Sequence, residues 1–97
     1  MPRPIYAEID IQALKHNLAR LRESVGDGTL WAVVKANAYG HGLENAVEAF
    51  ADADGFATID LCDAERARRA GWHKRVLLLE GFFDETDIEP LQDLDVE

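Results

Sequence analysis

The sequence predicts an α/β fold in which parallel strand–helix units form one incomplete domain. Strand-like and helix-like segments alternate along the 97 residues with short connections, which is the order found in parallel α/β folds. The runs LWAVV (30–34) and RVLLLEG (75–81) are rich in apolar residues, as expected of strands covered on both faces. A few such units cannot close a barrel and would leave a sheet edge uncovered. We therefore expect this chain to be part of a longer fold.

The first half of the chain predicts two strands and two helices. A short strand is expected at residues 6–9, followed by a helix with Asp10 as its N-cap and Gly26 as its stop. Apolar residues recur along this helix at helical spacing: Ile11, Leu14, Leu18, Leu21 and Val25. After the strand at 30–34, a second helical stripe covers residues 43–50.

The second half begins with another strand and helix. Gly55 precedes a short strand, FATI (56–59). Asp60, with Asp63 three residues later, predicts the start of a helix over residues 61–70. The apolar run 75–81 then supplies the next strand.

A short helix is expected near the end of the chain. Either Asp84 or Thr86 is expected to cap it, with Pro90 in its first turns, where proline is tolerated. The acidic segment LQDLDVE follows, and Val96 would begin a further strand.

The charge of the chain argues against two classes of partner. The formal net charge is -9, and the acidic excess lies after Gly40. Such a surface repels phosphate backbones and anionic lipids, so neither nucleic acid nor a membrane surface is an expected partner. The basic trio Arg66, Arg68 and Arg69 is interpreted as the solvated face of a helix, because acidic residues surround it and aromatic residues do not interleave with it.

The chain start and its cysteine content point to the cytoplasm. MPRPIYAEID has no apolar run of signal-peptide length, and the remaining sequence has none long enough to span a membrane. The single cysteine, Cys62, forms no intramolecular disulfide. We interpret it as a small residue in the first turn of a helix rather than as a nucleophile.

Lys35 is the residue that most needs an explanation, because it directly follows the apolar run 30–34 and a buried ammonium is costly unless paired or neutralised. Strand alternation would point it the same way as Val33 and Trp31, at the carboxyl end where parallel α/β folds place active sites. A desolvated amine there could attack a carbonyl cofactor such as pyridoxal phosphate. The alternative is a lysine that extends to solvent or pairs with an acid.

The residues after Lys35 form a glycine-containing turn with polar side chains. Gly40 and Gly42 permit a tight turn, and Tyr39 could offer its hydroxyl to a phosphate or substrate group. Tyr39 could equally be a packed aromatic residue. We interpret His41 as stabilising the turn rather than as an acid–base group, and Asn37 as holding the loop.

AVVKANAYGHG (32–42), together with AEIDIQALKHN, ADGFATID and LLLEGFF, resembles the amino-terminal part of alanine racemase. The resemblance extends over nearly all of the chain. It implies a TIM-type (β/α)8 barrel that carries pyridoxal 5'-phosphate, a carboxy-terminal β domain and a homodimer. It further implies that the enzyme interconverts L-alanine and D-alanine, the supply reaction for peptidoglycan precursors.

The same resemblance assigns roles to individual residues. Lys35 matches the lysine that forms the internal aldimine and acts as one acid or base. Tyr39 matches the tyrosine that hydrogen-bonds the cofactor phosphate, and Val33 is a further candidate for cofactor contact. The family's opposite acid–base tyrosine, from the partner subunit, and its arginine beside the pyridine nitrogen match no position in residues 1–97. We therefore expect this chain alone to be inactive.

Three other interpretations remain open. The chain could belong to a pyridoxal phosphate carrier or homeostasis protein of the same fold, although the long NAYGHG run disfavours that class. It could belong to a racemase of broader amino-acid specificity. From a different class, it could be a non-catalytic assembly module whose uncovered apolar faces drive oligomerisation.

Overall fold

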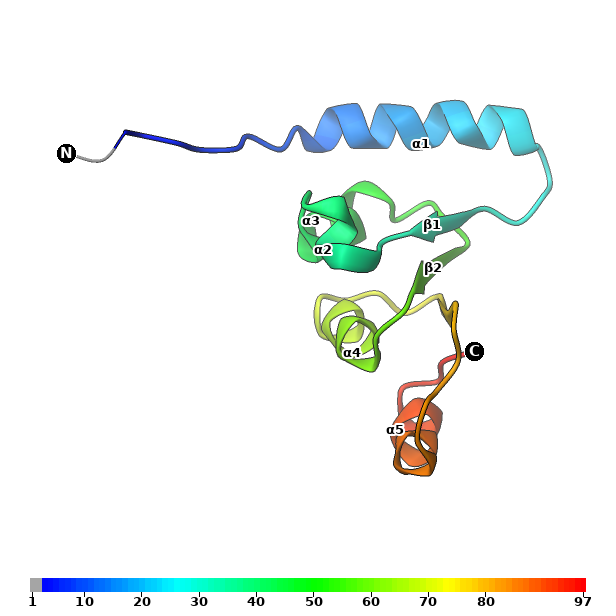
Figure 1. The fold of residues 1–97 in the computed structure, drawn as a ribbon. Helices are drawn as coiled ribbons and strands as arrows, with labels where there is room; N and C mark the ends of the chain where they lie inside the picture. The colour runs from blue at the N-terminus through cyan, green and yellow to red at the C-terminus, as the bar shows by residue number, and fades with distance from the viewer. Residues whose placement is uncertain (1–2) are drawn as a thin grey trace.

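A parallel three-stranded sheet lies at the centre of the computed structural model, which describes residues 3–97. The strand order is β1-β2-β3 (Figure 1). The strands are β1 (Trp31–Val33), β2 (Gly55–Thr58) and β3 (Arg75–Leu78). The helices are α1 (Ile11–Val25), α2 (Lys35–Tyr39), α3 (Leu43–Ala49), α4 (Leu61–Arg69), η1 (Glu85–Asp87) and α5 (Ile88–Asp93). The predicted alternation of strands and helices around a parallel sheet is confirmed.

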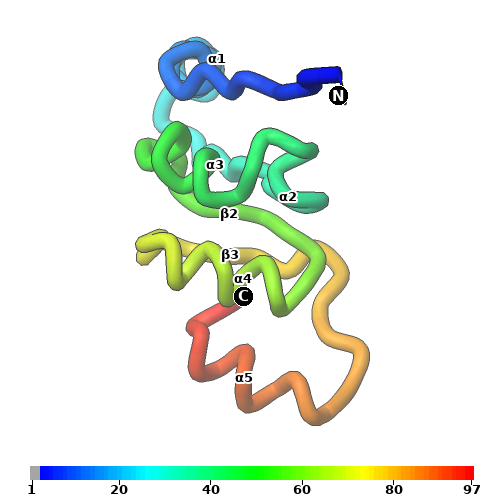
Figure 2. The backbone as a smooth tube through the Cα atoms, turned by 90° about the vertical axis from the view of Figure 1, so that its left-hand side faces the viewer, coloured from blue at the N-terminus to red at the C-terminus, as the bar shows by residue number. Residues whose placement is uncertain are grey.

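Helices cover one face of this sheet. α3 and α4 lie side by side on that face, and α1 packs against α3 (Figure 2). Phe56 of β2 is fully buried and stacks on Trp72, with ring centroids 3.7 Å apart. Buried alanines on α3 and α4, such as Ala46 and Ala64, let the helix backbones approach this aromatic pair.

The opposite face of the sheet is not covered by any helix of residues 3–97 (Figure 1). Val33 is 42% exposed and Leu79 is 46% exposed. The expectation that the strands are covered on both faces is therefore wrong for this chain. β3 also ends at Leu78 instead of reaching residue 81, because the chain turns there: the Gly81 amide donates to the Leu78 carbonyl, and Gly81 has a positive φ of 72°.

The end of the chain returns to the sheet. The Glu97 amide donates to the Val76 carbonyl over 2.9 Å, and the Leu78 amide donates to the Glu97 carbonyl over 2.8 Å. These two bonds have the pattern of a parallel ladder. They agree with the expectation that a further strand begins near Val96.

The segment before α1 differs from the prediction. Residues 6–9 form no strand, and Tyr6 is 84% exposed. Figure 1 shows this segment projecting away from the sheet. An extended segment becomes a strand only when a neighbouring strand accepts and donates its backbone hydrogen bonds, and none of residues 3–97 does so here.

The predicted helix boundaries are largely confirmed. The Asp10 carboxylate accepts hydrogen bonds from the amides of Gln12 and Ala13, and Gly26 closes α1 with a positive φ of 57°. Of the two caps proposed near the end of the chain, Asp84 accepts from the Thr86 amide and so caps η1, whereas Asp87 occupies the N-cap position of α5, the helix that contains Pro90. Asp60 occupies the N-cap position of α4, but its side chain makes no capping bond.

Within residues 3–97, no helix combines the length and the apolar character that crossing a membrane requires.

Candidate active site

The segment after β1 has an unusual backbone conformation. Four consecutive non-glycine residues have positive φ angles: Ala36 (53°), Asn37 (55°), Ala38 (56°) and Tyr39 (57°). L-residues disfavour this left-handed region by roughly 1–2 kcal/mol each, although asparagine tolerates it. The predicted loop is thus a left-handed turn, and the fold around it must compensate for the strain.

Backbone hydrogen bonds close this turn onto itself and onto Val34, the residue that follows β1. The Ala38 amide donates to the Val34 carbonyl over 2.9 Å, and the Gly42 amide donates to the Asn37 carbonyl over 2.9 Å. Gly40 and Gly42 have φ values of 90° and 94°, which side chains with a Cβ atom rarely adopt. The two glycines therefore let the chain leave the left-handed turn and enter α3.

The Asn37 side chain links the turn to two helices. Its Oδ1 atom accepts from the Leu43 amide at the start of α3 and from the Arg66 guanidinium on α4, both over 3.0 Å. Arg66 also contacts the Glu44 carboxylate over 2.8 Å. The hydrogen bond from Arg66 lowers the pKa of Glu44, and the same bond raises the pKa of Arg66.

The three predicted site residues lie together at the carboxyl end of β1. Val33 is the last residue of β1 on the open face, and Lys35 begins the left-handed turn that ends at Tyr39. Lys35 is half-buried, whereas Tyr39 is 59% exposed. Among residues 3–97, neither the Lys35 ammonium nor the Tyr39 hydroxyl forms a hydrogen bond or an ion pair. Both groups are available to a ligand at this end of the sheet.

Two secondary interpretations agree with the structure. The His41 ring nitrogen Nδ1 lies 2.9 Å from the Ala38 carbonyl, which is a contact within the turn. Cys62 is exposed in the first turn of α4, beside Leu61. The turn-stabilising interpretation of His41 is therefore supported by a direct contact.

The basic trio on α4 is not a uniformly solvated face. Arg69 pairs with Glu65 at the surface, as expected, but Arg66 reaches the turn after β1. Arg68 donates hydrogen bonds to four backbone carbonyls: those of Trp72, Lys74, Leu94 and Asp95. The interpretation is wrong for Arg66 and Arg68, because a guanidinium has enough donors to bridge segments that are distant in sequence.

Sequence reasoning missed the partners of Asn37. The roles of Arg66 and Glu44 depend on the packing of α3 against α4, which no local pattern reveals. Thr58, the buried last residue of β2, likewise donates to the Asp63 carboxylate over 3.1 Å. The one available signal was the placement of polar residues directly after the carboxyl ends of β1 and β2.

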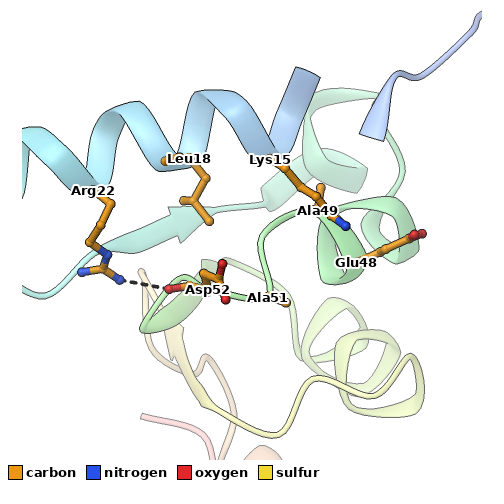
Figure 3. A pocket seen from close by; sticks show the side chains of 8 residues that line it. Lys15, Leu18, Arg22, Glu48, Ala49, Ala51 and Asp52 are labelled. Carbon is orange, nitrogen blue, oxygen red and sulfur yellow. Dashed lines mark hydrogen bonds between the residues drawn. The ribbon is translucent and has the colours of Figure 1, made fainter. Parts of the chain in front are cut away.

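A hollow of about 350 Å³ lies elsewhere, between α1 and α3 (Figure 3). Lys15 and Glu48 line its rim, and Arg22 at its other end donates to the Asp52 carbonyl over 3.0 Å. None of the predicted site residues lines this hollow. It lies on the helix-covered side of the molecule and is separate from the candidate site.

Comparison with known proteins identifies close relatives. The family model described as alanine racemase, N-terminal domain, matches residues 9–97. The alanine racemase of Delftia acidovorans is 61% identical over 89 residues, which are 92% of this chain and 24% of the relative. That of Variovorax paradoxus is 55% identical over 96 residues, covering 99% of this chain and 26% of the relative. The chain spans about a quarter of the length of these curated relatives.

Solved structures agree with the fold. The biosynthetic alanine racemase from Pseudomonas aeruginosa has a TM-score of 0.86 at 39% identity, over 91% of this chain and 25% of that one. The alanine racemase from Bacillus anthracis, solved with bound L-Ala-P, has a TM-score of 0.83 at 34% identity, over 96% of this chain and 26% of that one. The strand–helix units described above are thus part of a TIM-type barrel, and the chain belongs to the alanine racemase family, within its N-terminal domain.

Proposed function

We propose that this chain is the amino-terminal part of a pyridoxal 5'-phosphate-dependent alanine racemase, an isomerase that interconverts L-alanine and D-alanine. The observation that carries the proposal is Lys35, an amine without a protein partner among residues 3–97, located at the carboxyl end of a barrel strand. The family match and the L-Ala-P bound in a relative support the choice of substrate.

The residues at this site fit the chemistry of the cofactor. A half-buried amine without an acidic partner suits covalent attachment to an aldehyde. The exposed Tyr39 hydroxyl suits a hydrogen bond to a phosphate. Val33, on the open face of β1, offers an apolar surface beside them. We assign Lys35 to attachment, Tyr39 to the phosphate and Val33 to apolar contact.

In the proposed mechanism Lys35 has two roles. Its Nζ atom would hold the cofactor and, when free, would accept the α-proton from one face of alanine or return it. The cofactor, when bound, supplies an electron sink for the pair left at the α-carbon. Tyr39 would donate a hydrogen bond to the phosphate and so help to keep the cofactor in place beside Lys35. A second acid–base group on the opposite face must come from outside residues 3–97.

The remaining parts of the proposal concern the whole protein. We propose that the complete enzyme adds the other barrel strands and a carboxy-terminal β domain, and that it works as a homodimer in the cytoplasm. Its D-alanine would serve as a peptidoglycan precursor. The share of the curated relatives that this chain spans supports a longer protein. The chain alone is expected to lack racemase activity.

The attachment role of Lys35 is tested by covalent labelling. The chain is incubated with pyridoxal phosphate, reduced with borohydride and analysed by intact mass and peptide mapping. We expect one adduct, on Lys35, and its loss in Lys35→Ala. Lys74→Ala is the matched control, because the Lys74 ammonium already donates to the carbonyls of Ala51 and Ala53. Labelling that persists in Lys35→Ala would contradict the assignment.

The racemase activity is tested with a chimera. Residues 1–97 replace the matching amino-terminal part of the Delftia acidovorans enzyme, which is 61% identical. We expect the chimera to racemise alanine and to lose activity by several orders of magnitude in the Lys35→Ala form. A chimera that folds and binds pyridoxal phosphate at Lys35 but does not racemise alanine would contradict the proposed reaction.

A further inference from the structure

The left-handed turn at the site requires restraint from outside itself. Ala36, Ala38 and Tyr39 have φ between 53° and 57°, a conformation that residues with a Cβ atom leave unless surrounding contacts hold them. Backbone bonds close the turn, but they connect it only to neighbouring residues of the chain. A contact from a distant element is needed to fix its orientation relative to the sheet.

Arg66 supplies such a contact from α4. Its Nη2 atom donates to Asn37 Oδ1 over 3.0 Å, although the two residues are 29 positions apart in the sequence. Asn37 is the central residue of the turn, with Lys35 two positions before it and Tyr39 two positions after it. The same Oδ1 atom accepts from the Leu43 amide. One side-chain oxygen therefore connects the turn to both α3 and α4.

Glu44 holds Arg66 in place for this contact. Nη2 of Arg66 lies 2.8 Å from Glu44 Oε2, and Nε lies 3.2 Å from Glu44 Oε1. A guanidinium held at two nitrogens by a carboxylate has a fixed plane. Asp63 lies 4.0 Å from Nη1 of Arg66 and accepts from Thr58 at the end of β2. Arg66 thus contacts Asn37, in the turn after β1, and lies near Asp63, which binds the end of β2.

The ion pair between Arg66 and Glu44 has the properties of a local restraint rather than of a large contribution to the stability of the whole fold. The side chains of Arg66 and Glu44 are 39% and 60% exposed, and exposed ion pairs contribute little to the free energy of unfolding. A contact that contributes little to the whole fold can still determine the conformation of a strained turn.

We propose that Arg66, oriented by Glu44, is a positioning residue that holds the left-handed turn through Asn37 and so directs Lys35 and Tyr39. The role in directing these two residues toward a cofactor rests on the function proposed above. The role in holding the turn does not depend on any ligand. The two parts can therefore be tested separately.

The first test is amide hydrogen exchange of the 97-residue chain without cofactor. Arg66→Gln should speed exchange at Gly40, Gly42 and Leu43 by about tenfold, because a charge-assisted hydrogen bond to the turn is lost. Arg69→Gln is the matched control, since Arg69 is on the same helix and, within the described residues 3–97, pairs only with Glu65. Equal exchange in both variants would overturn the proposal. Thermal unfolding should be similar in both.

A double-mutant cycle then identifies the route of the effect. Asn37→Ala removes the acceptor that Arg66 uses. If Arg66 acts through Asn37, adding Arg66→Gln to Asn37→Ala should produce little further change in exchange at Gly40 and Gly42. Independent, additive effects of the two substitutions would overturn this route. Arg66→Lys should rescue poorly, because an ammonium cannot reproduce the planar contact to both partners.

The cofactor-directed part is measured by the rate of Lys35 labelling with pyridoxal phosphate. We expect Arg66→Gln to slow labelling several-fold relative to Arg69→Gln, without a change in the labelled residue. Unchanged rates would overturn this part. If the unsubstituted chain takes no adduct on Lys35, the attachment function fails together with this part, while hydrogen exchange still decides whether Arg66 holds the turn.

Discussion

At the scale of single residues, a few polar side chains connect segments that are far apart in the sequence. Asp54 is an example outside the candidate site. Its Oδ2 atom accepts from the Leu30 amide over 2.7 Å and from the Arg22 guanidinium over 3.0 Å. The Leu30 bond, and then the Arg22 bond, lowers the pKa of Asp54 below its usual 3.8. The carboxylate form therefore joins the end of α1 to the start of β1.

This contact predicts a dependence of stability on pH. A carboxyl whose pKa is lower in the folded state adds stability above its unfolded pKa, and this contribution is lost as pH falls through the folded pKa. We expect the free energy of unfolding, measured by urea denaturation, to decrease as the pH is lowered below about 4. The decrease should be less steep in Asp54→Asn. Asp52→Asn is the control, because Asp52 binds Arg22 through its backbone carbonyl. If the free energy of unfolding decreases equally steeply at low pH in Asp54→Asn and in the unsubstituted chain, this account is contradicted.

At the scale of elements, the amino ends of the three strands form one packed row. The pairing register places Trp31, Gly55 and Arg75 side by side. A Cβ atom on Gly55 would lie 2.4 Å from the Trp31 ring, and the Arg75 guanidinium lies 4.6 Å from the ring centroid. Arg75 in turn pairs with Glu97 over 2.8 Å. The tryptophan ring covers the glycine and leaves no space for a side chain.

This row predicts the effect of a single methyl group. Gly55→Ala should lower the free energy of unfolding by about 1–3 kcal/mol, the usual cost of overpacking. Replacing the ring at the same time, in Gly55→Ala/Trp31→Leu, should recover part of the loss relative to Trp31→Leu alone. Denaturant unfolding of the four proteins gives the coupling. If Gly55→Ala does not lower the free energy of unfolding, the Trp31 ring moves aside freely and the prediction is wrong.

At the scale of the whole molecule, one face of the sheet is open. The molecule measures 46 × 45 × 21 Å, which is the shape of a slab with helices on one side. Leu79, Phe82 and Phe83 are 46%, 51% and 81% exposed near the carboxyl end of β3. Exposed apolar patches of this kind mark contact surfaces. This is also the observation behind the assembly-module alternative.

The open face predicts association of the isolated chain. Apolar contact favours association, and repulsion between chains with a net charge of -9 opposes it. Added salt screens this repulsion and should therefore increase association. We expect sedimentation velocity to show a fraction of oligomers that increases with salt concentration. This fraction should be smaller in Leu79→Ser. Val25→Ser, at the end of α1, is the control and should leave association unchanged. A monodisperse monomer at all salt concentrations, with ordinary cooperative unfolding, would contradict the prediction.

Much of the fold could be predicted from local patterns. Helix caps such as Asp10 and Gly26 act within a few residues, so the boundaries of α1 could be assigned without tertiary information. The apolar runs of β1 and β3 also indicated a parallel sheet. The strand expected at residues 6–9 could not be tested locally, because a strand exists only where another strand completes its hydrogen bonds.

For the candidate site too, some features could be predicted from the sequence and others depended on the tertiary structure. The sequence by itself determined that Lys35 and Tyr39 follow an apolar strand, because apolar runs and glycine-containing turns are local features. Only the tertiary structure decided how they are held. The left-handed turn, and its link from Asn37 to Arg66 and Glu44, depends on α3 lying against α4. A hydrogen bond between distant residues depends on their positions in space, which a pattern along the chain does not contain.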